Sequence, residues 1–99
     1  MADWRATVTN VRTLLEEEGW VRTEAIAHKG SNGLVEERGH IVALGLAIEI
    51  FHNEDGVDIA FLAMSGFRAV VTASNRYSDR PILRAIRRVI ATERKKVQP

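Results

Sequence analysis

Cysteine is absent from this chain, so no disulfide holds the fold and no thiolate can act as a nucleophile or metal ligand. Secreted domains of this size often depend on disulfides for their stability. The absence of cysteine therefore favours a protein of the reducing cytoplasm.

Long hydrophobic runs are also missing. The most apolar run, residues 41–51, is far shorter than the roughly 20 residues that span a bilayer. The first residues, Met1 to Arg5, lack the basic region and the following apolar region of a secretory signal peptide. We expect no membrane segment and no export signal.

The net charge is small, but the charges are unevenly distributed along the chain. Residues 76–96 hold eight basic residues and only two acids, a net charge of +6, which leaves −5 for the remainder of a chain whose total is +1. With 99 residues, 45% of them hydrophobic and 27% charged, the sequence is typical of one globular domain over 1–99.

Hydrophobic residues near the start of the chain recur at helical spacing. Intervals of four, three and four residues separate Trp4, Val8, Val11 and Leu15. This pattern predicts a helix over 3–18. Gly19 suits the left-handed position after the last helical residue, and Trp20 would then contact Leu15 across a Schellman stop.

A second helix is predicted over 81–95, because Pro81 fits the first turn of a helix. A frayed tail is expected over 97–99. At 100° per residue, six basic residues of this segment fall within an arc of about 120°: Arg80, Arg84, Arg87, Arg88, Arg94 and Lys95. The opposite arc holds five hydrophobic residues: Ile82, Leu83, Ile86, Val89 and Ile90.

These basic residues, called the arginine face below, have several interpretations. Arginine is a good helix former and cations near a helix C-terminus are favoured, so a solvated helix surface is one interpretation. The planar guanidinium also matches phosphate or carboxylate, which points to nucleic acid or to an acidic protein surface. The acidic residues 16–18 could pair with this face within the chain or in a neighbour. A membrane surface is disfavoured, because the apolar arc is needed for the core.

The middle of the chain has the composition of strands and tight turns. Strands are predicted over 20–28, 41–52, 57–64 and 67–74, with turns at 29–33, 53–56 and 65–66. Residues 34–39 are ambiguous, and 23–39 also fits a helix-turn-helix, which the acidic pair Glu36-Glu37 disfavours. The fold class is therefore α+β: an antiparallel meander of four strands, or five if 34–39 pairs, with a helix at each end.

Both faces of the predicted sheet are apolar. Pairing through the turn at 53–56 puts Ile48 and Ile50 on one face with Ile59 and Phe61. The other face holds smaller residues and would take Phe67, Ala69, Val71 and Ala73 from the last strand. Either one helix covers each face, or both helices cover the first face and the second meets a partner or a second copy. The candidate self-association residues are Ala43, Gly45, Ala47, Ala60, Leu62 and Met64.

No residue pattern indicates catalysis, a cofactor or a metal site. His52 lies near Glu54, Asp55 and Asp58 in sequence, but carboxylates are common at hairpin turns. The glycines at 30 and 33 do not have phosphate-loop spacing. We therefore expect a non-enzymatic binding protein without a cofactor.

The first functional hypothesis is that the arginine face binds a polyanion, with nucleic acid backbone the first choice. The alternative is a protein-interaction module, such as a small inhibitor, chaperone or adaptor, that forms a homodimer through its Ala/Gly-rich sheet face. Both hypotheses fit a small domain with two unusual surfaces and no catalytic pattern.

Overall fold

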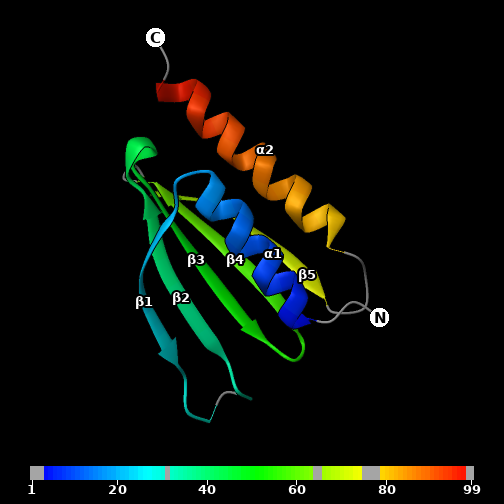
Figure 1. Ribbon diagram of the computed structural model, residues 1–99. Coiled ribbons are helices and arrows are strands. Elements are labelled where there is room, and N and C mark those ends of the chain that lie inside the picture. The colour runs from blue at the N-terminus through cyan, green and yellow to red at the C-terminus, as the bar shows by residue number, and fades with distance from the viewer. Residues whose placement is uncertain (1–3, 31, 64–65, 75–78, 98–99) are drawn as a thin grey trace.

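The computed structural model has five consecutive strands, with one helix before them and one helix after them along the chain (Figure 1). The structure describes residues 4–30, 32–63, 66–74 and 79–97. The elements are α1 (Trp4–Glu17), β1 (Val21–Ala27), β2 (Val35–Ile41), the 3₁₀ turn η1 (Val42–Leu44), β3 (Leu46–Asn53), β4 (Gly56–Ala63), β5 (Gly66–Ser74) and α2 (Arg80–Val97).

The strands form one antiparallel sheet in the order β1-β2-β3-β4-β5. This arrangement confirms the predicted α+β meander and settles the ambiguous residues 34–39, because β2 pairs with both β1 and β3. The meander therefore has five strands.

The prediction of one strand over 41–52 was wrong. β2 ends at Ile41, and the chain turns through η1 and Gly45, whose φ of 59° lies in the left-handed region, before β3 begins at Leu46. Hydrophobic alternation continues through this turn because η1 buries Leu44 and leaves Val42 83% exposed. Alternation alone could not reveal the break.

α1 ends as the sequence predicted. Gly19 has a φ of 98°, the Trp20 N–H donates to the Leu15 carbonyl at 2.9 Å, and the Gly19 N–H donates to the Glu16 carbonyl at 3.0 Å. These two bonds are those of a Schellman stop. The stop directs Trp20 into the core, where it is 2% exposed.

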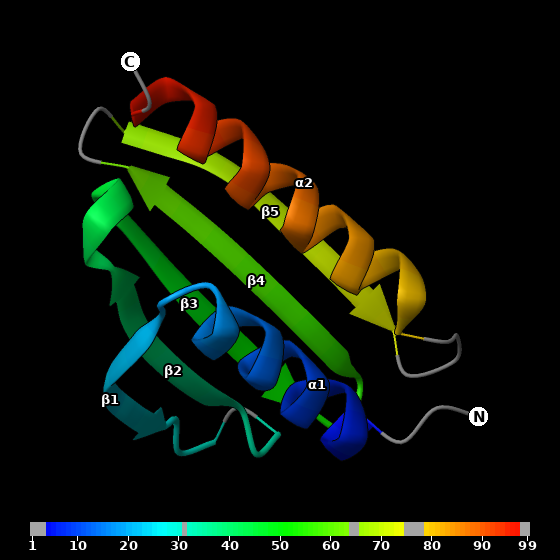
Figure 2. The same ribbon diagram turned by 45° about the horizontal axis from the view of Figure 1, so that its top comes forward.

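Both helices lie on the same face of the sheet (Figure 2). α1 contacts β3 and β4, and α2 contacts β5 and η1. The core between these layers includes Ile48, Ile59 and Phe61 from the sheet with Leu15 and Ile86 from the helices, all fully buried. The arrangement with one helix on each face was therefore wrong, and the opposite face has no helix over it.

The predicted face of β5 was wrong from Ala69 onward, although Phe67 still has Leu62 of the uncovered face as its backbone partner. The β4–β5 register shifts between Phe61 and Leu62, and such an irregularity reverses the alternation of all following residues. The backbone partners are Ala69–Phe61, Val71–Ile59 and Ala73–Val57. Ala69 and Val71 therefore pack against the core rather than on the uncovered face.

Candidate functional site

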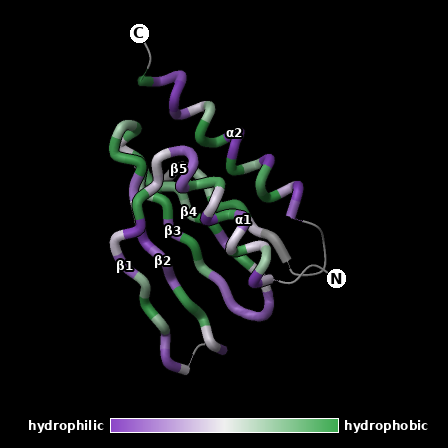
Figure 3. The backbone as a smooth tube through the Cα atoms, viewed as in Figure 1, coloured by the Kyte–Doolittle hydropathy of each residue, from purple (hydrophilic) through white to green (hydrophobic). Residues whose placement is uncertain are grey.

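The arginine face lies along α2 on the side away from the sheet. Arg80, Arg84, Arg87, Arg88 and Lys95 are exposed. Ile82, Ile86 and Ile90 are buried on the other side of the helix. Figure 3 shows the same separation as alternating hydrophilic and hydrophobic segments along α2. Val97 belongs to this helix rather than to the predicted tail, and residues 98–99 lie outside the described part.

One member of the arginine face is used within the molecule. Arg94 is half-buried and contacts the end of α1, where it donates to the Glu18 carboxylate at 2.7 Å and to the Glu18 carbonyl at 3.0 Å. Within the described part of the chain, no ion pair involves Arg84, Arg87, Arg88 or Lys95. The predicted contact between the acidic end of α1 and the basic segment thus occurs, but it occupies a single arginine.

The predicted self-association residues lie on or beside the uncovered face. Ala47 and Leu62 are cross-strand partners, and Ala60 pairs with Glu49 on one side and Val70 on the other. Ala43 and Gly45 are exposed in the turn between β2 and β3. Met64 lies outside the described residues.

The other half of the uncovered face carries charged residues that pair with each other. Arg38 contacts the Glu36 carboxylate at 2.5 Å and the Glu24 carboxylate at 3.4 Å. His28 lies 2.9 Å from Glu36 on the other side. The Arg38 hydrogen bond lowers the pKa of Glu36, which is only 4% exposed. The charges on this half of the face therefore pair with one another.

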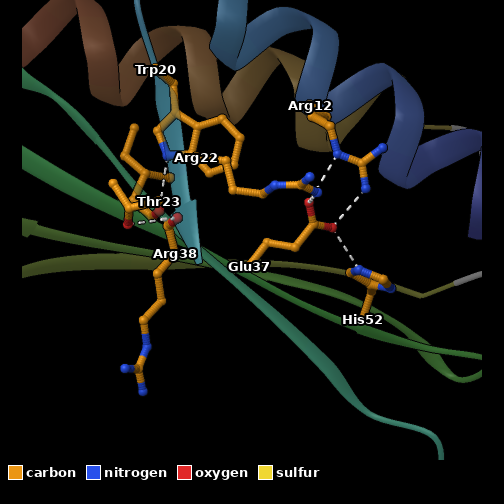
Figure 4. A network of polar contacts seen from close by, with 8 residues as sticks. Arg12, Trp20, Arg22, Thr23, Glu37, Arg38 and His52 are labelled. Atoms are coloured by element: carbon orange, nitrogen blue, oxygen red, sulfur yellow. Dashed lines mark hydrogen bonds and ion pairs between the residues drawn. The ribbon is translucent and has the colours of Figure 1, made fainter. Parts of the chain in front are cut away.

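A second polar network, absent from the sequence predictions, lies between α1 and the sheet. The side chains of Arg12, Arg22 and His52 converge on the Glu37 carboxylate (Figure 4). Arg12 donates to both carboxylate oxygens, at 2.9 and 2.7 Å. Arg22 donates at 3.0 Å, and His52 Nε2 lies at 2.8 Å. Elements α1, β1, β2 and β3 each contribute one of these four residues.

Glu37 is buried but ionised. Burial acts to raise its pKa, yet the hydrogen bonds from Arg12, Arg22 and His52 outweigh burial and lower the pKa to about 2. A carboxylate with three donors and 1% exposure is not available as a general base. The network therefore connects four elements of the fold through one buried carboxylate.

His52 does not join the carboxylates that follow it in sequence. Its ring points inward to Glu37, and the centroid of this ring lies 5.8 Å from the centroid of the Trp4 ring. Its Nδ1 is buried and has no hydrogen-bond partner among the described residues. No group of three or more metal-ligating side chains occurs in the described ranges.

The Glu37 network was missed because residues 34–39 were ambiguous. Once 35–41 is recognised as a strand, Val35, Glu37, Gly39 and Ile41 share the covered face, since the side-chain period of a strand is two. A glutamate at a core position requires cationic partners. That rule would have predicted cationic partners for Glu37, and the structure identifies them as Arg12 and Arg22.

No protein family, no curated protein and no solved structure matches this chain. Across the helices that the structure describes, none is both long and apolar enough to cross a membrane. Functional inference therefore rests on the surfaces of the chain itself.

Proposed function

We propose that this protein binds the phosphate backbone of nucleic acid through the arginine face of α2. The observation that carries the proposal is the set of four exposed cations, Arg84, Arg87, Arg88 and Lys95, that follow the exposed Arg80 on one side of a single helix. None of these four forms an ion pair within the described part of the chain. Clustered cations without internal partners repel one another and favour an external polyanion.

The spacing of these cations suits a phosphate strand. At 1.5 Å per residue, the helix advances about 16 Å from Arg84 to Lys95. Along the duplex axis one strand rises about 3.4 Å per phosphate, so a protein helix aligned with that axis spans about five phosphates. Guanidinium groups bind phosphate oxygens through two parallel N–H donors, so the three arginines supply geometry as well as charge.

Binding of this kind would be independent of base sequence. No aromatic residue belongs to the arginine face, and specific base readout depends on contacts to base edges or on stacking. Tyr77, the aromatic residue nearest to the face in sequence, lies outside the described residues. We expect similar affinities for duplexes of different sequence and the same length.

Fluorescence anisotropy with a labelled duplex of about 20 base pairs tests the proposal at low salt. Arg87→Glu should weaken binding about tenfold, because a phosphate contact becomes a repulsion. Lys29→Glu is the matched control, since Lys29 is an exposed cation in the β1–β2 turn and its reversal changes the net charge equally. It should alter binding less than about twofold. Equal effects of the two variants would contradict a localised site.

An acidic protein surface is the competing ligand for the same face. Polyglutamate is a suitable probe, because it presents carboxylates without phosphates or bases. Tighter binding of the duplex than of polyglutamate at equal ionic strength supports the nucleic-acid proposal. Binding of polyglutamate with no measurable binding of the duplex would overturn it.

A further inference from the structure

The uncovered sheet face has an apolar end beside η1. Two of the most exposed large hydrophobic residues of the described chain lie there, Val42 at 83% and Val21 at 63%. Val21 pairs with His40, which in turn pairs with Ala47, and Ala47 pairs with Leu62, so these four residues form a row across four strands. We call Val21, Val42, Ala43, Ala47 and Leu62 the η1 patch.

The η1 patch combines a projection with a depression. Val42 projects from the 3₁₀ turn, and beside it lies a cavity of about 390 Å³. The cavity is lined by His40, Ile41, Val42, Gly45, Leu46, Ala47, Leu62 and Ala63. Small residues at Gly45 and Ala47 keep it open. A two-fold contact requires that the same patch supply both complementary shapes, and this patch has both.

The charge of the patch also suits a second copy. Its residues and the cavity lining include no Asp, Glu, Lys or Arg. Elsewhere the described surface is charged: Glu24 and Arg38 occupy the other end of the same face, and the arginine face covers α2. Two copies joined through the η1 patch therefore bury apolar surface without bringing like charges together.

The available area limits the size of this contact. Five strands about 4.8 Å apart and about seven residues long cover roughly 550 Å² in projection. Stable dimers bury about 800 Å² per partner, and the η1 patch occupies only part of the face. The contact is therefore smaller than a standard interface and falls in the size range of transient complexes.

We infer that two copies of this chain associate through their η1 patches, with Val42 of each copy entering the cavity beside Leu62 of the other. The inference does not rest on nucleic-acid binding, because α2 lies on the opposite side of the sheet and its arginines stay exposed in the dimer. A failure of either proposal leaves the other intact.

Sedimentation equilibrium of the full chain over a concentration series up to about 1 mM measures the association. The wild type should form dimers, and Val42→Glu should weaken dimerisation at least tenfold, because it places a carboxylate in the apolar cavity of the partner. Val70→Glu is the matched control, since Val70 is 52% exposed on the same face but outside the patch. It should dimerise as the wild type does.

A wild type that remains monomeric throughout the series would overturn the inference, and so would a Val42→Glu variant that dimerises normally. Circular dichroism checks that both variants are folded. The absence of natural cysteine permits a second measurement. A short bismaleimide should link Val42→Cys into covalent dimers but leave Lys29→Cys, in the β1–β2 turn at the other end of the sheet, monomeric. Equal cross-linking of the two cysteine variants would contradict the placement of the η1 patch at the dimer contact.

Discussion

Arg12 and Glu37 form a bidentate ion pair across 25 residues of sequence, with one hydrogen bond to each carboxylate oxygen. This pair joins α1 to β2. The strand β2 pairs with β3, but the main contacts of the helices with the sheet are those of α1 with β3 and β4 and of α2 with β5. Its position explains why a charged residue can occupy the core side of β2. The network holds the β1–β2 end of the sheet against α1.

Glu37→Gln should destabilise the protein by about 2–3 kcal/mol. Loss of one partner in a buried ion pair costs 3–5 kcal/mol when the remaining charge stays buried. Here the cost is lower, because the Arg12 and Arg22 side chains are 32% and 50% exposed and can regain water. Urea denaturation measures the change. Glu24→Gln, at a site that is 53% exposed, is the control and should change stability by less than about 0.5 kcal/mol.

Stability should fall in acid because of the same carboxylate. The pKa of Glu37 is about 2 in the fold against an ordinary 4.5, so its ionised form stabilises the fold fully above pH 4.5. That contribution, about 3 kcal/mol, is lost as the pH falls from 4.5 towards 2. Urea denaturation between about pH 6 and pH 3 should show a shallower slope for Glu37→Gln than for the wild type. Identical slopes would contradict the low pKa.

Gly39 should tolerate no side chain. A Cβ at this position would lie 2.5 Å from the Val21 carbonyl and would also collide with the Trp20 ring. The ring cannot shift freely, because its Nε1–H donates to the Ile48 carbonyl at 3.0 Å. Gly39→Ala should therefore cost about 1–3 kcal/mol in urea denaturation. In a double-mutant cycle, Trp20→Phe should recover part of that cost. If the free-energy changes of the two single variants simply add in the double variant, a collision between the new Cβ and Trp20 is excluded.

Releasing Arg94 should strengthen polyanion binding. Glu18 holds the Arg94 guanidinium through its carboxylate at 2.7 Å, and this half-buried pair, with side chains 39% and 32% exposed, contributes about 1 kcal/mol or less to stability. Glu18→Gln removes the competing carboxylate and should raise the affinity for a duplex two- to threefold in the anisotropy assay. Glu17→Gln, which alters net charge equally at an exposed site, should raise it less. No difference between the two variants would mean that Arg94 lies outside the binding surface.

The helices were predictable because local rules determine them. Gly19 and Trp20 define the end of α1, and the arc of isoleucines on α2 defines its buried side. Both depend on residues within a few positions of each other. The turns between β1 and β2 and between β3 and β4 were predictable for the same reason, but the turn at Gly45 was not.

The remaining features depend on contacts between distant residues. The register shift at Phe61 and Leu62 moved Ala69 to the covered face, and no single residue in the sequence signals it. The residues of β2 stayed ambiguous in sequence, because the cations that pair with Glu37 come from other elements. The contact between Arg94 and Glu18 spans 76 residues and could be suggested only by charge.

The salt dependence of duplex binding tests the central claim most directly. With four to five phosphate contacts, log K should fall with log salt at a slope of about −4 for the wild type. Arg84→Glu/Arg87→Glu/Arg88→Glu, changed together, should abolish binding while circular dichroism shows a folded domain. A wild-type slope near zero, or a triple variant that binds the duplex unchanged, would contradict the assignment of α2 as a nucleic-acid surface.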